Sequence, residues 1–447
     1  MKKILIISYY FAPENKVASI RYTKIAKYLH KQGFDVSVIC ASCVEKVDPI
    51  LSKDCEKINN IYRIMSPKLY SSVQKKYMSK RENVVSFWHE EENEKKNSIL
   101  TTVKRKVYKA LRAVFSYTLT ILLDYGAYFS AKKYIKKRLH NEKYDIVIST
   151  YGPRCNHMLG HWLKKGNKEI KWVTDFRDPM VSRDTNVIRS FLLRKKEKSY
   201  CTDSDEIIGV ANGVISEDLK NRFQDKWHLL TNGFDYDDMN YIGIGDNTVR
   251  SRNERIIMTY TGALYKDFWS DLRPVFKAID ELDKEGKCRK TDFCIRYAGN
   301  DIAVLMDQAK AFGCEEIIEN CGYVSREKAI LLQKNSDVLL HATWFVKKGE
   351  DVLSGKIFEY LMIGKEIIST VSGTLYDSMV KKIISDSKSG ICYEAAKKGD
   401  YCELKQYIYE LYIKKKESGY IECMQNTDVI KQYSYENITK KMIDFLI

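Results

Sequence analysis

The sequence predicts an α/β protein built from two doubly wound domains in tandem. Short, nearly uninterrupted apolar runs, such as residues 3–8 and 256–261, are typical of parallel strands buried on both faces. Stretches with helical spacing of apolar residues separate these runs, as βαβ units require. Residues 236–254 are polar and lack periodicity, and we expect a linker at 241–255.

Each predicted element follows from its local pattern. In the first half, residues 19–31 place apolar side chains on one face of a helix, and Gly33 ends it. The remaining predicted strands of that half lie at 36–40, 144–149, 172–174 and 206–210, with helices near 156–165 and 216–223. In the second half, strands are predicted at 256–261, 293–297, 317–319, 338–341 and 366–369, with helices between them.

Length and composition exclude several classes of protein. The chain has 447 residues, of which 44% are hydrophobic and 30% charged, so it can bury a core without disulfides. No run reaches the roughly 18 apolar residues of a membrane-spanning helix. The start of the chain resembles a signal peptide, but its apolar run at 4–7 is short and lacks a small-residue cleavage site, so we expect a buried strand there.

The twelve cysteines are scattered, which favours reduced thiols. One pair, Cys40 and Cys43, has redox spacing, but two small residues at a strand end are the simpler interpretation. A zinc site would need a second such pair, and the sequence has none.

The net charge of +16 is concentrated in one region. Between Ser98 and His140 there are ten lysine and arginine residues and one aspartate. Residues 98–123 form a predicted amphipathic helix whose basic side chains lie largely off the apolar stripe: Lys104, Arg105, Lys109 and Arg112. This pattern suits an interfacial helix on an anionic membrane, and it equally suits a packed helix with solvated lysines. Nucleic acid is not an expected partner, because no recognised binding motif is present.

Three familiar motifs are weak or incomplete. The turn after the first strand has no glycine, so dinucleotide binding there is disfavoured. The run from Gly349 to Lys356 is one residue too long for a P-loop, and Ile357 occupies the place of its Ser or Thr. Two D-x-D triplets, at 203–205 and 235–237, can hold a divalent ion but are also common as turn residues.

A strand, loop and helix near residue 350 carry the strongest chemical signal. The strand at 337–344 leads through a polar loop to a helix that begins at Ser354, Gly355 and Lys356. Free amides and the positive end of the helix dipole favour an anion there, and Lys356 adds charge. Glu359 follows one turn later, where a carboxylate can accept two ribose hydroxyls. This arrangement predicts a nucleoside diphosphate site at the carboxyl end of a strand.

These segments resemble the retaining GT-B glycosyltransferases of glycosyltransferase family 4. The run Ser-Gly-Lys-Ile-Phe-Glu-Tyr-Leu at 354–361 is similar to the donor-site helix of that family. The resemblance implies that Glu359 binds the ribose and that Asp351, eight positions earlier, is a second, catalytic acid. The turn at 261–266 is similar to the first turn of the donor domain, so Lys266 is expected to meet the diphosphate. The turn ending at Val324 resembles the one whose backbone contacts the base.

Segments of the first half agree with this resemblance. Residues 175–179 resemble the DFRDPW element, residues 207–219 the ITVSPG…EDL strand and helix, and residues 232–235 the NGFD turn. Residues 149–161 are similar to a segment facing the cleft. We expect His157 to contact the transferred sugar or the acceptor, with a structural hydrogen bond as the alternative, and Arg177 and Asp178 to line the acceptor side.

The resemblance implies a GT-B fold, with two Rossmann-like domains facing across a cleft. The expected boundaries are 1–240 for the acceptor side, with a basic insertion at 46–143, 256–425 for the nucleotide-sugar side, and 426–447 for a helix that crosses back. The implied reaction moves a sugar, with retention, from a nucleotide sugar to a glycan or lipid-linked acceptor in surface polysaccharide synthesis, such as capsule or O-antigen. A UDP-sugar is the expected donor.

No cofactor or metal is expected, because fixed positive groups can stabilise the departing diphosphate. We expect a cytoplasmic protein with peripheral contact to the inner face of the cell membrane. Two other functions stay open: a GT-B nucleotide-sugar epimerase, which needs no acceptor, and a non-catalytic scaffold.

Overall fold

The computed structural model describes most of the chain. The described residues are 2–42, 47–58, 60–65, 99–181, 185, 187–241, 254–266, 269–346 and 352–447, with only the backbone given for 99–117, Ile188 and Tyr241. Contacts within the chain divide it into two compact units. The first comprises 1–208, 225–227 and 446, and the second comprises 209–224, 228–445 and 447.

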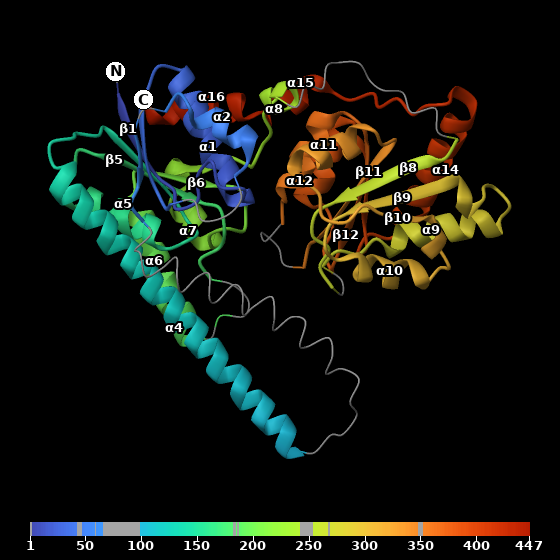
Figure 1. Ribbon diagram of the computed structural model, residues 1–447, viewed down its shortest axis with the longest axis horizontal. Coiled ribbons are helices and arrows are strands. Elements are labelled where there is room, and N and C mark those ends of the chain that lie inside the picture. The colour runs from blue at the N-terminus through green and yellow to red at the C-terminus, as the bar shows by residue number, and fades with distance from the viewer. Residues whose placement is uncertain are drawn as a thin grey trace. The chain divides into compact units, whose positions relative to one another are not determined.

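The first half of the chain alternates strands and helices (Figure 1). Its elements are β1 (Lys3–Ile7), α1 (Val17–Lys31), β2 (Asp35–Cys40), α2 (Pro49–Cys55), β3 (Asn60–Arg63), α4 (Ile99–Arg138), β4 (Ile146–Thr150), α5 (Cys155–Gly166), β5 (Lys171–Phe176), α6 (Val187–Asp203), β6 (Glu206–Gly209), α7 (Glu217–Arg222), β7 (Trp227–Leu229) and α8 (Asp237–Tyr241). The sheet order is β3-β2-β1-β4-β5-β6-β7, with parallel pairing from β3 to β5.

The second half repeats the pattern. Its elements are β8 (Ile256–Thr261), α9 (Arg273–Lys284), β9 (Phe293–Ala298), α10 (Ile302–Lys310), β10 (Ile318–Asn320), α11 (Arg326–Lys334), β11 (Val338–Trp344), α12 (Gly355–Ile363), β12 (Glu366–Ser372), α13 (Met379–Ser387), β13 (Gly390–Glu394), α14 (Asp400–Ser418), α15 (Thr427–Lys431) and α16 (Tyr435–Leu446). The order β10-β9-β8-β11-β12-β13 is parallel throughout.

Both sheets have the strand order of a dinucleotide-binding fold. In each, the chain builds outward from a first strand in one direction and then returns to build in the other, so the order reverses at β1/β4 and at β8/β11. Ligands of open parallel sheets bind at such a reversal, beyond the carboxyl ends of the strands. Each unit therefore has one edge at which a ligand site is expected.

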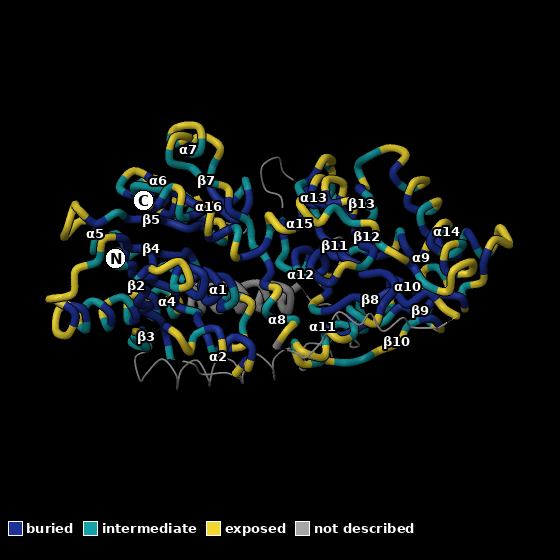
Figure 2. The backbone as a smooth tube through the Cα atoms, turned by 90° about the horizontal axis from the view of Figure 1, so that it is seen from above, coloured by how far each residue is buried: buried dark blue, intermediate teal, exposed yellow. Residues whose placement is uncertain are grey.

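The second sheet is covered by helices on both faces. The core on one face includes side chains of α9, α10 and α14, such as Phe276, Leu305 and Leu404. The core on the other face includes side chains of α11, α12 and α13, such as Ile330 and Phe358. Figure 2 shows the strands of both units as largely buried and the outer sides of the helices as exposed. This double covering explains why all six residues of β8 are buried.

The predicted strands agree closely with the structure, although strands β3 and β7 and helix α2 were not predicted. Three other helices also differ. The helix predicted at 98–123 continues to Arg138, so α4 has 40 residues. Helix α6 was not predicted, and the short helix α8 lies where we expected aperiodic linker. The side chains of Lys104, Arg105, Lys109 and Arg112 lie outside the described residues. The predicted domain boundaries stay predictions.

Two further expectations concern cysteines and membrane crossing. Every cysteine in the described part of the chain is a free thiol, as we predicted. Within the same part, no helix combines the length and the apolar composition needed to cross a bilayer.

Candidate functional site

The clearest ligand site of the second unit lies where β11 leads into α12. Ser354 is the residue before this helix, and its backbone is extended, as in an ordinary N-cap. A serine at this position normally caps the helix by accepting from an amide of the first turn. Here the Ser354 hydroxyl makes no such bond; it lies 3.0 Å from Nε2 of His341. Among the described residues, no side chain accepts from the amides that begin α12, so these amides remain available to another acceptor.

His341 holds this arrangement from inside the sheet. It is fully buried on β11, and its Nδ1 lies 2.8 Å from the Ser369 hydroxyl of β12. Burial lowers the pKa of His341 to about 3, so the imidazole is neutral. A neutral imidazole has one N–H and one lone pair, so one serine hydroxyl accepts a hydrogen bond and the other donates one.

Lys356 extends toward the turn after β8. Its Nζ donates to the Tyr260 hydroxyl at 3.0 Å and to the Ala263 carbonyl at 3.2 Å, and it lies 4.2 Å from the centre of the Tyr260 ring. No ion pair between Lys356 and a carboxylate occurs among the described residues. Burial lowers the pKa of Lys356 to about 8. Lys356 is thus a desolvated cation whose hydrogen-bond partners are neutral. The Glu359 and Asp301 carboxylates act on it only through space, and its charge favours an incoming anion.

The turn that receives Lys356 depends on Gly262. This residue has a φ of +96°, and a Cβ there would lie 2.8 Å from Cε of Lys356. Any other residue would be strained and would push the lysine away. At Gly355, in contrast, a Cβ would meet nothing within 4 Å, so the start of α12 faces open space.

Glu359 lies one turn into α12 and is fixed by α11. The Gln333 amide is buried and donates both to Glu359 Oε1, at 2.6 Å, and to Thr261 Oγ1, at 2.9 Å. Arg326 Nε lies 3.9 Å from the other Glu359 oxygen, and the Glu359 side chain is 25% exposed. Arg326 also donates to Asp238 at 2.7 Å. Glu359 is therefore held in place and keeps access to solvent.

Sequence reasoning missed Gln333 and Arg326. Both lie on α11, at least 26 residues before Glu359, so no local motif connects them to it. The one available signal was a polar residue, Gln333, spaced three residues after Ile330 on the buried face of that helix.

Three further residues were predicted for the donor site, and the structure describes two of them. Lys266 is exposed in the turn after β8, and Val324 is half-buried in the turn after β10. Asp351 lies outside the described residues. The structure thus brings together Ser354, Gly355, Lys356 and Glu359 in α12.

In the first unit, His157 is a core residue. It is fully buried on α5, with Nδ1 2.8 Å from the Ser149 hydroxyl. The rings around it are Tyr151, Trp172, Phe176 and Tyr200. Burial lowers the pKa of His157 to about 3, and Nε2 has no hydrogen-bond partner. Burial and the contact with Ser149 favour the structural alternative, and contact with the sugar or the acceptor stays a prediction.

The charged groups at the carboxyl edge of the first sheet are paired with one another. Arg21 donates from two nitrogens to Asp175, at 3.1 and 3.3 Å, and Thr150 donates to the same carboxylate at 3.1 Å. Arg177 donates to the carbonyls of Ala18 and Gly152 and pairs with Asp178 at 3.2 Å. The Asp178 side chain is 60% exposed, so it remains open to a partner.

The two D-x-D triplets have structural partners. Asp203 lies 2.6 Å from His161, and Asp205 pairs with Lys164 at 2.8 Å. Asp235 accepts from the backbone N–H of Asp237, which is a turn contact.

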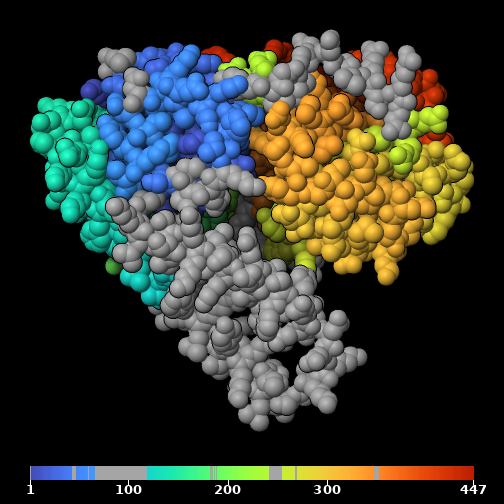
Figure 3. All heavy atoms as spheres, in the orientation of Figure 1, coloured from blue at the N-terminus to red at the C-terminus, as the bar shows by residue number. Residues whose placement is uncertain are grey.

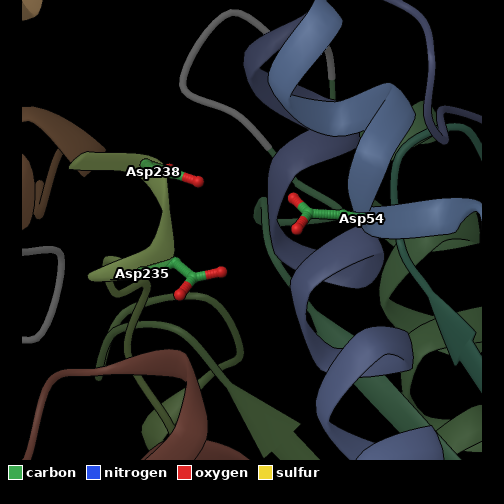
Figure 4. A group of neighbouring side chains, drawn as sticks. All are labelled: Asp54, Asp235 and Asp238. Atoms are coloured by element: carbon green, nitrogen blue, oxygen red, sulfur yellow. The ribbon is translucent and has the colours of Figure 1, made fainter. Parts of the chain in front are cut away.

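Figure 4 shows Asp235 and Asp238 near the start of α8 and Asp54 on α2. Asp54 pairs with Lys24 and Lys27, at 2.5 and 3.0 Å, within the first unit. Asp238 pairs with Arg326 within the second unit. Each of these two carboxylates is therefore neutralised by a cation of its own unit.

Comparison with known proteins identifies the fold. No protein-family model and no curated sequence matches the chain. The N-terminal domain of Candida albicans trehalose-6-phosphate phosphatase has a TM-score of 0.61 at 11% identity, over 100% of this chain and 96% of that one. Sucrose-phosphate synthase from Thermosynechococcus elongatus has a TM-score of 0.57 at 10% identity, over 100% and 98%. The lipopolysaccharide outer core galactosyltransferase WaaB has a TM-score of 0.55 at 11% identity, over 100% of both chains.

These similarities establish a GT-B fold of two Rossmann-like units, which confirms the predicted fold class. The structural neighbours include glycosyltransferases. At 10–11% identity, the likeness is one of fold.

Proposed function

We propose that the protein is a retaining glycosyltransferase that takes its sugar from a nucleoside diphosphate sugar and moves it to a glycan or lipid-linked acceptor. The observation that carries the proposal is the start of α12. Uncapped amides, a lysine with neutral partners and a fixed carboxylate follow one another within six residues, at the reversal point of a parallel sheet. This is the chemistry that a nucleoside diphosphate requires.

Each group has a distinct task in this proposal. The amides of α12 and the Lys356 ammonium bind the diphosphate, and they stabilise it further as it departs with both electrons of the bond to the sugar. Glu359 accepts the two hydroxyls of the ribose. Lys266, from the turn after β8, adds positive charge. Fixed cations and amides do this work, so the proposal requires neither metal nor cofactor.

The acceptor side belongs to the first unit in this proposal. Asp178 and Arg177 follow β5 at the carboxyl edge of that sheet, and Asp178 is open to solvent. Asp351 remains the proposed second acid of the donor site. A surface polysaccharide precursor is the proposed acceptor class, and a UDP-sugar the proposed donor.

Nucleotide binding tests the donor site directly. Thermal unfolding is measured with UDP, GDP, ADP, TDP and CMP for the wild type, Glu359→Ala and a control, Glu403→Ala, whose side chain is exposed on α14. We expect one diphosphate to raise the Tm of the wild type and the control, and to lose most of this effect in Glu359→Ala. The absence of a shift with every nucleotide would contradict the proposal. A product formed from nucleotide sugar alone, without acceptor, would instead indicate an epimerase.

Contact with an anionic membrane is a second part of the proposal. The described part of α4 buries Asp124, Ala127, Ala131 and Ile135 on one face. The opposite face carries three exposed apolar side chains and then four lysines: Leu122, Tyr125, Phe129, Lys132, Lys133, Lys136 and Lys137. In Figure 3, this region, coloured turquoise, lies on the surface of the first unit. An exposed apolar face beside basic groups suits a membrane interface.

Vesicle binding tests this part. The double variant Lys132→Glu/Lys136→Glu is compared with Lys310→Glu/Lys398→Glu, two exposed lysines of the second unit. At about 1 kcal/mol for each basic residue, we expect the first variant to bind phosphatidylglycerol vesicles about 30-fold more weakly and the second to bind like the wild type. Equal binding by both variants would contradict the membrane contact. Binding to pure phosphatidylcholine measures the apolar contribution.

A further inference from the structure

Three aromatic side chains form an unusual cluster at the carboxyl edge of the second sheet. The aromatic cluster consists of Tyr265, Trp269 and Trp344. The Trp344 ring lies 4.9 Å from that of Trp269, at 79°, and 6.0 Å from that of Tyr265, at 88°. Tyr265 is 56% exposed, and both tryptophans are partly exposed. Large aromatic rings normally contribute most when buried, so such a cluster at a ligand edge calls for a partner.

Two of the three rings are carried by well-anchored backbone. Trp344 is the last residue of β11 and pairs in register with Ser372 of β12. The segment that carries Trp269 is held by the buried Gln308 side chain, which donates to the Ser270 carbonyl at 2.7 Å and accepts from the Leu272 amide at 2.8 Å. Thr370 of β12 donates to the Asp271 carbonyl at 2.6 Å. The two tryptophans are therefore preorganised, and Tyr265 joins them from the turn after β8.

The aromatic cluster is a neighbour of the anion site at the start of α12. Lys356 donates to the carbonyl of Ala263, two residues before Tyr265. Glu359, the proposed ribose ligand, is tied through Gln333 to Thr261 of β8. Tyr265 also acts electrostatically on Lys356. The aromatic cluster therefore begins beside the anion site, so a sugar joined to a diphosphate at the start of α12 comes within reach of it.

The shape of the cluster suits a sugar ring. A pyranose has an apolar face of C–H groups and a rim of hydroxyls, so it packs on an aromatic face while a phenol hydroxyl contacts its rim. Two rings nearly perpendicular to a third form a corner. A flat nucleobase prefers a single parallel face, so the corner favours the saturated ring.

We propose that Tyr265, Trp269 and Trp344 form the subsite for the sugar ring of the nucleotide sugar and determine which sugar the protein accepts. This inference rests on the proposed function, because it assumes that a nucleoside diphosphate binds at α12.

Paired titrations separate the sugar from the nucleotide. Calorimetric affinities are measured for UDP and UDP-glucose, GDP and GDP-mannose, ADP and ADP-glucose, and dTDP and dTDP-glucose, using the pair that binds the wild type. The variants are Tyr265→Leu, in an exposed turn, and Trp344→Leu. The control is Phe191→Leu, a 68% exposed phenylalanine on α6 of the first unit. Unchanged diphosphate affinity also shows that a variant is folded.

The expected result is a loss confined to the sugar. Tyr265→Leu and Trp344→Leu each weaken nucleotide-sugar binding about fivefold or more and change diphosphate binding by less than about twofold. The control leaves the ratio of the two affinities unchanged. Equal losses for both ligands would overturn the inference in favour of base stacking, and no loss for either would leave the rings structural. If the wild type binds no diphosphate, the proposed function itself fails; if it binds diphosphate and the ratio does not move, the sugar subsite alone fails.

Discussion

His157 in the first unit and His341 in the second are alike in burial and in the contact of Nδ1, and they differ in what Nε2 contacts. Both are fully buried, both place Nδ1 2.8 Å from a serine hydroxyl, and burial lowers the pKa of both to about 3. Nε2 of His157 faces a cage of aromatic rings without a hydrogen-bond partner. Nε2 of His341 reaches Ser354 and holds its hydroxyl away from the capping position of α12. A buried imidazole thus packs in the core of the first unit, and in the second unit a buried imidazole keeps a serine from capping a helix.

The cations at the carboxyl edges of the two sheets also differ in their partners. Arg21 of the first unit is buried against Asp175, so its charge is neutralised inside the fold. Lys356 of the second unit contacts a phenol and a carbonyl, which are both neutral. The two sheets share the order of their first six strands. Of these two cations, Arg21 is ion-paired, whereas Lys356 has no ion pair within the described residues. The strand order therefore provides a possible ligand site at the carboxyl edge of each sheet. Whether the cation at that edge is already ion-paired decides whether the site can bind an anion.

The largest expected effect is on the stability of the first unit. Arg21→Leu leaves the buried Asp175 carboxylate unpaired, and we expect it to lower the free energy of unfolding by about 3–5 kcal/mol. Asp178→Ala, at an exposed neighbouring site, is the control and should change it by less than about 0.5 kcal/mol. Urea unfolding measures both. A loss below about 1 kcal/mol for Arg21→Leu would mean that Asp175 is not isolated from water.

Removing the unpaired cation should instead affect binding. Lys356→Ala deletes a charged contact to the diphosphate, worth about 1.5–3 kcal/mol, so its affinity should fall about 10- to 150-fold. Stability should change little, because the hydrogen-bond partners of Lys356 within the described residues, a phenol and a carbonyl, are both neutral. The control, Lys328→Ala, removes an exposed lysine of α11 and should bind like the wild type. Calorimetry distinguishes these results, and full affinity in Lys356→Ala would remove the central cation from the proposal.

The pH dependence of diphosphate binding also tests whether the charge of Lys356 contributes. Burial lowers the pKa of Lys356 to about 8, and only the protonated form attracts a diphosphate. Affinity should therefore be highest below pH 8 and fall about tenfold between pH 7 and pH 9 as the ammonium loses its proton. Lys356→Arg stays charged over this range and should not show the decrease. A parallel decrease in both proteins would assign it to another group.

The smallest expected effect comes from exchanging the two histidines for leucine. In His341→Leu, the Ser354 hydroxyl is free to cap α12 and competes with the ligand, which should weaken diphosphate binding about fivefold. Adding Ser354→Ala removes the competing cap and should restore the affinity. His157→Leu, the matched control, should bind within about twofold of the wild type. If His157→Leu weakened binding as much as His341→Leu, the contrast between the units would fail.

What the sequence could predict depended on how local the signal was. Strands buried on both faces, such as β1, have continuous apolar runs in the sequence. The start of α12 likewise lies within one strand–loop–helix segment. The contacts that decide function are not local. Gln333 is 26 residues from Glu359, and Arg21 is 154 residues from Asp175, so neither pairing leaves a spacing in the sequence.

Sequence patterns could reveal neither the surroundings of His157 nor the presence of helix α6, and the physical reason is the same. The burial of His157 depends on rings from other elements, including Trp172 and Tyr200, and the spacing of His157 and His161 on a helix cannot reveal them. Helix α6 was missed because it leaves Val187, Phe191 and Leu192 exposed, so its apolar residues do not mark a single buried face.

The central claim is that a nucleoside diphosphate binds at the carboxyl edge of the second sheet and not at that of the first. Amide hydrogen exchange, with and without each of UDP, GDP, ADP and TDP at millimolar concentration, tests it most directly. With the nucleotide that binds, we expect slower exchange at 262–266 and 354–360, where free amides gain an acceptor, and unchanged exchange at 149–153 and 175–178. Protection confined to the first unit, or protection nowhere in the chain, would contradict the account.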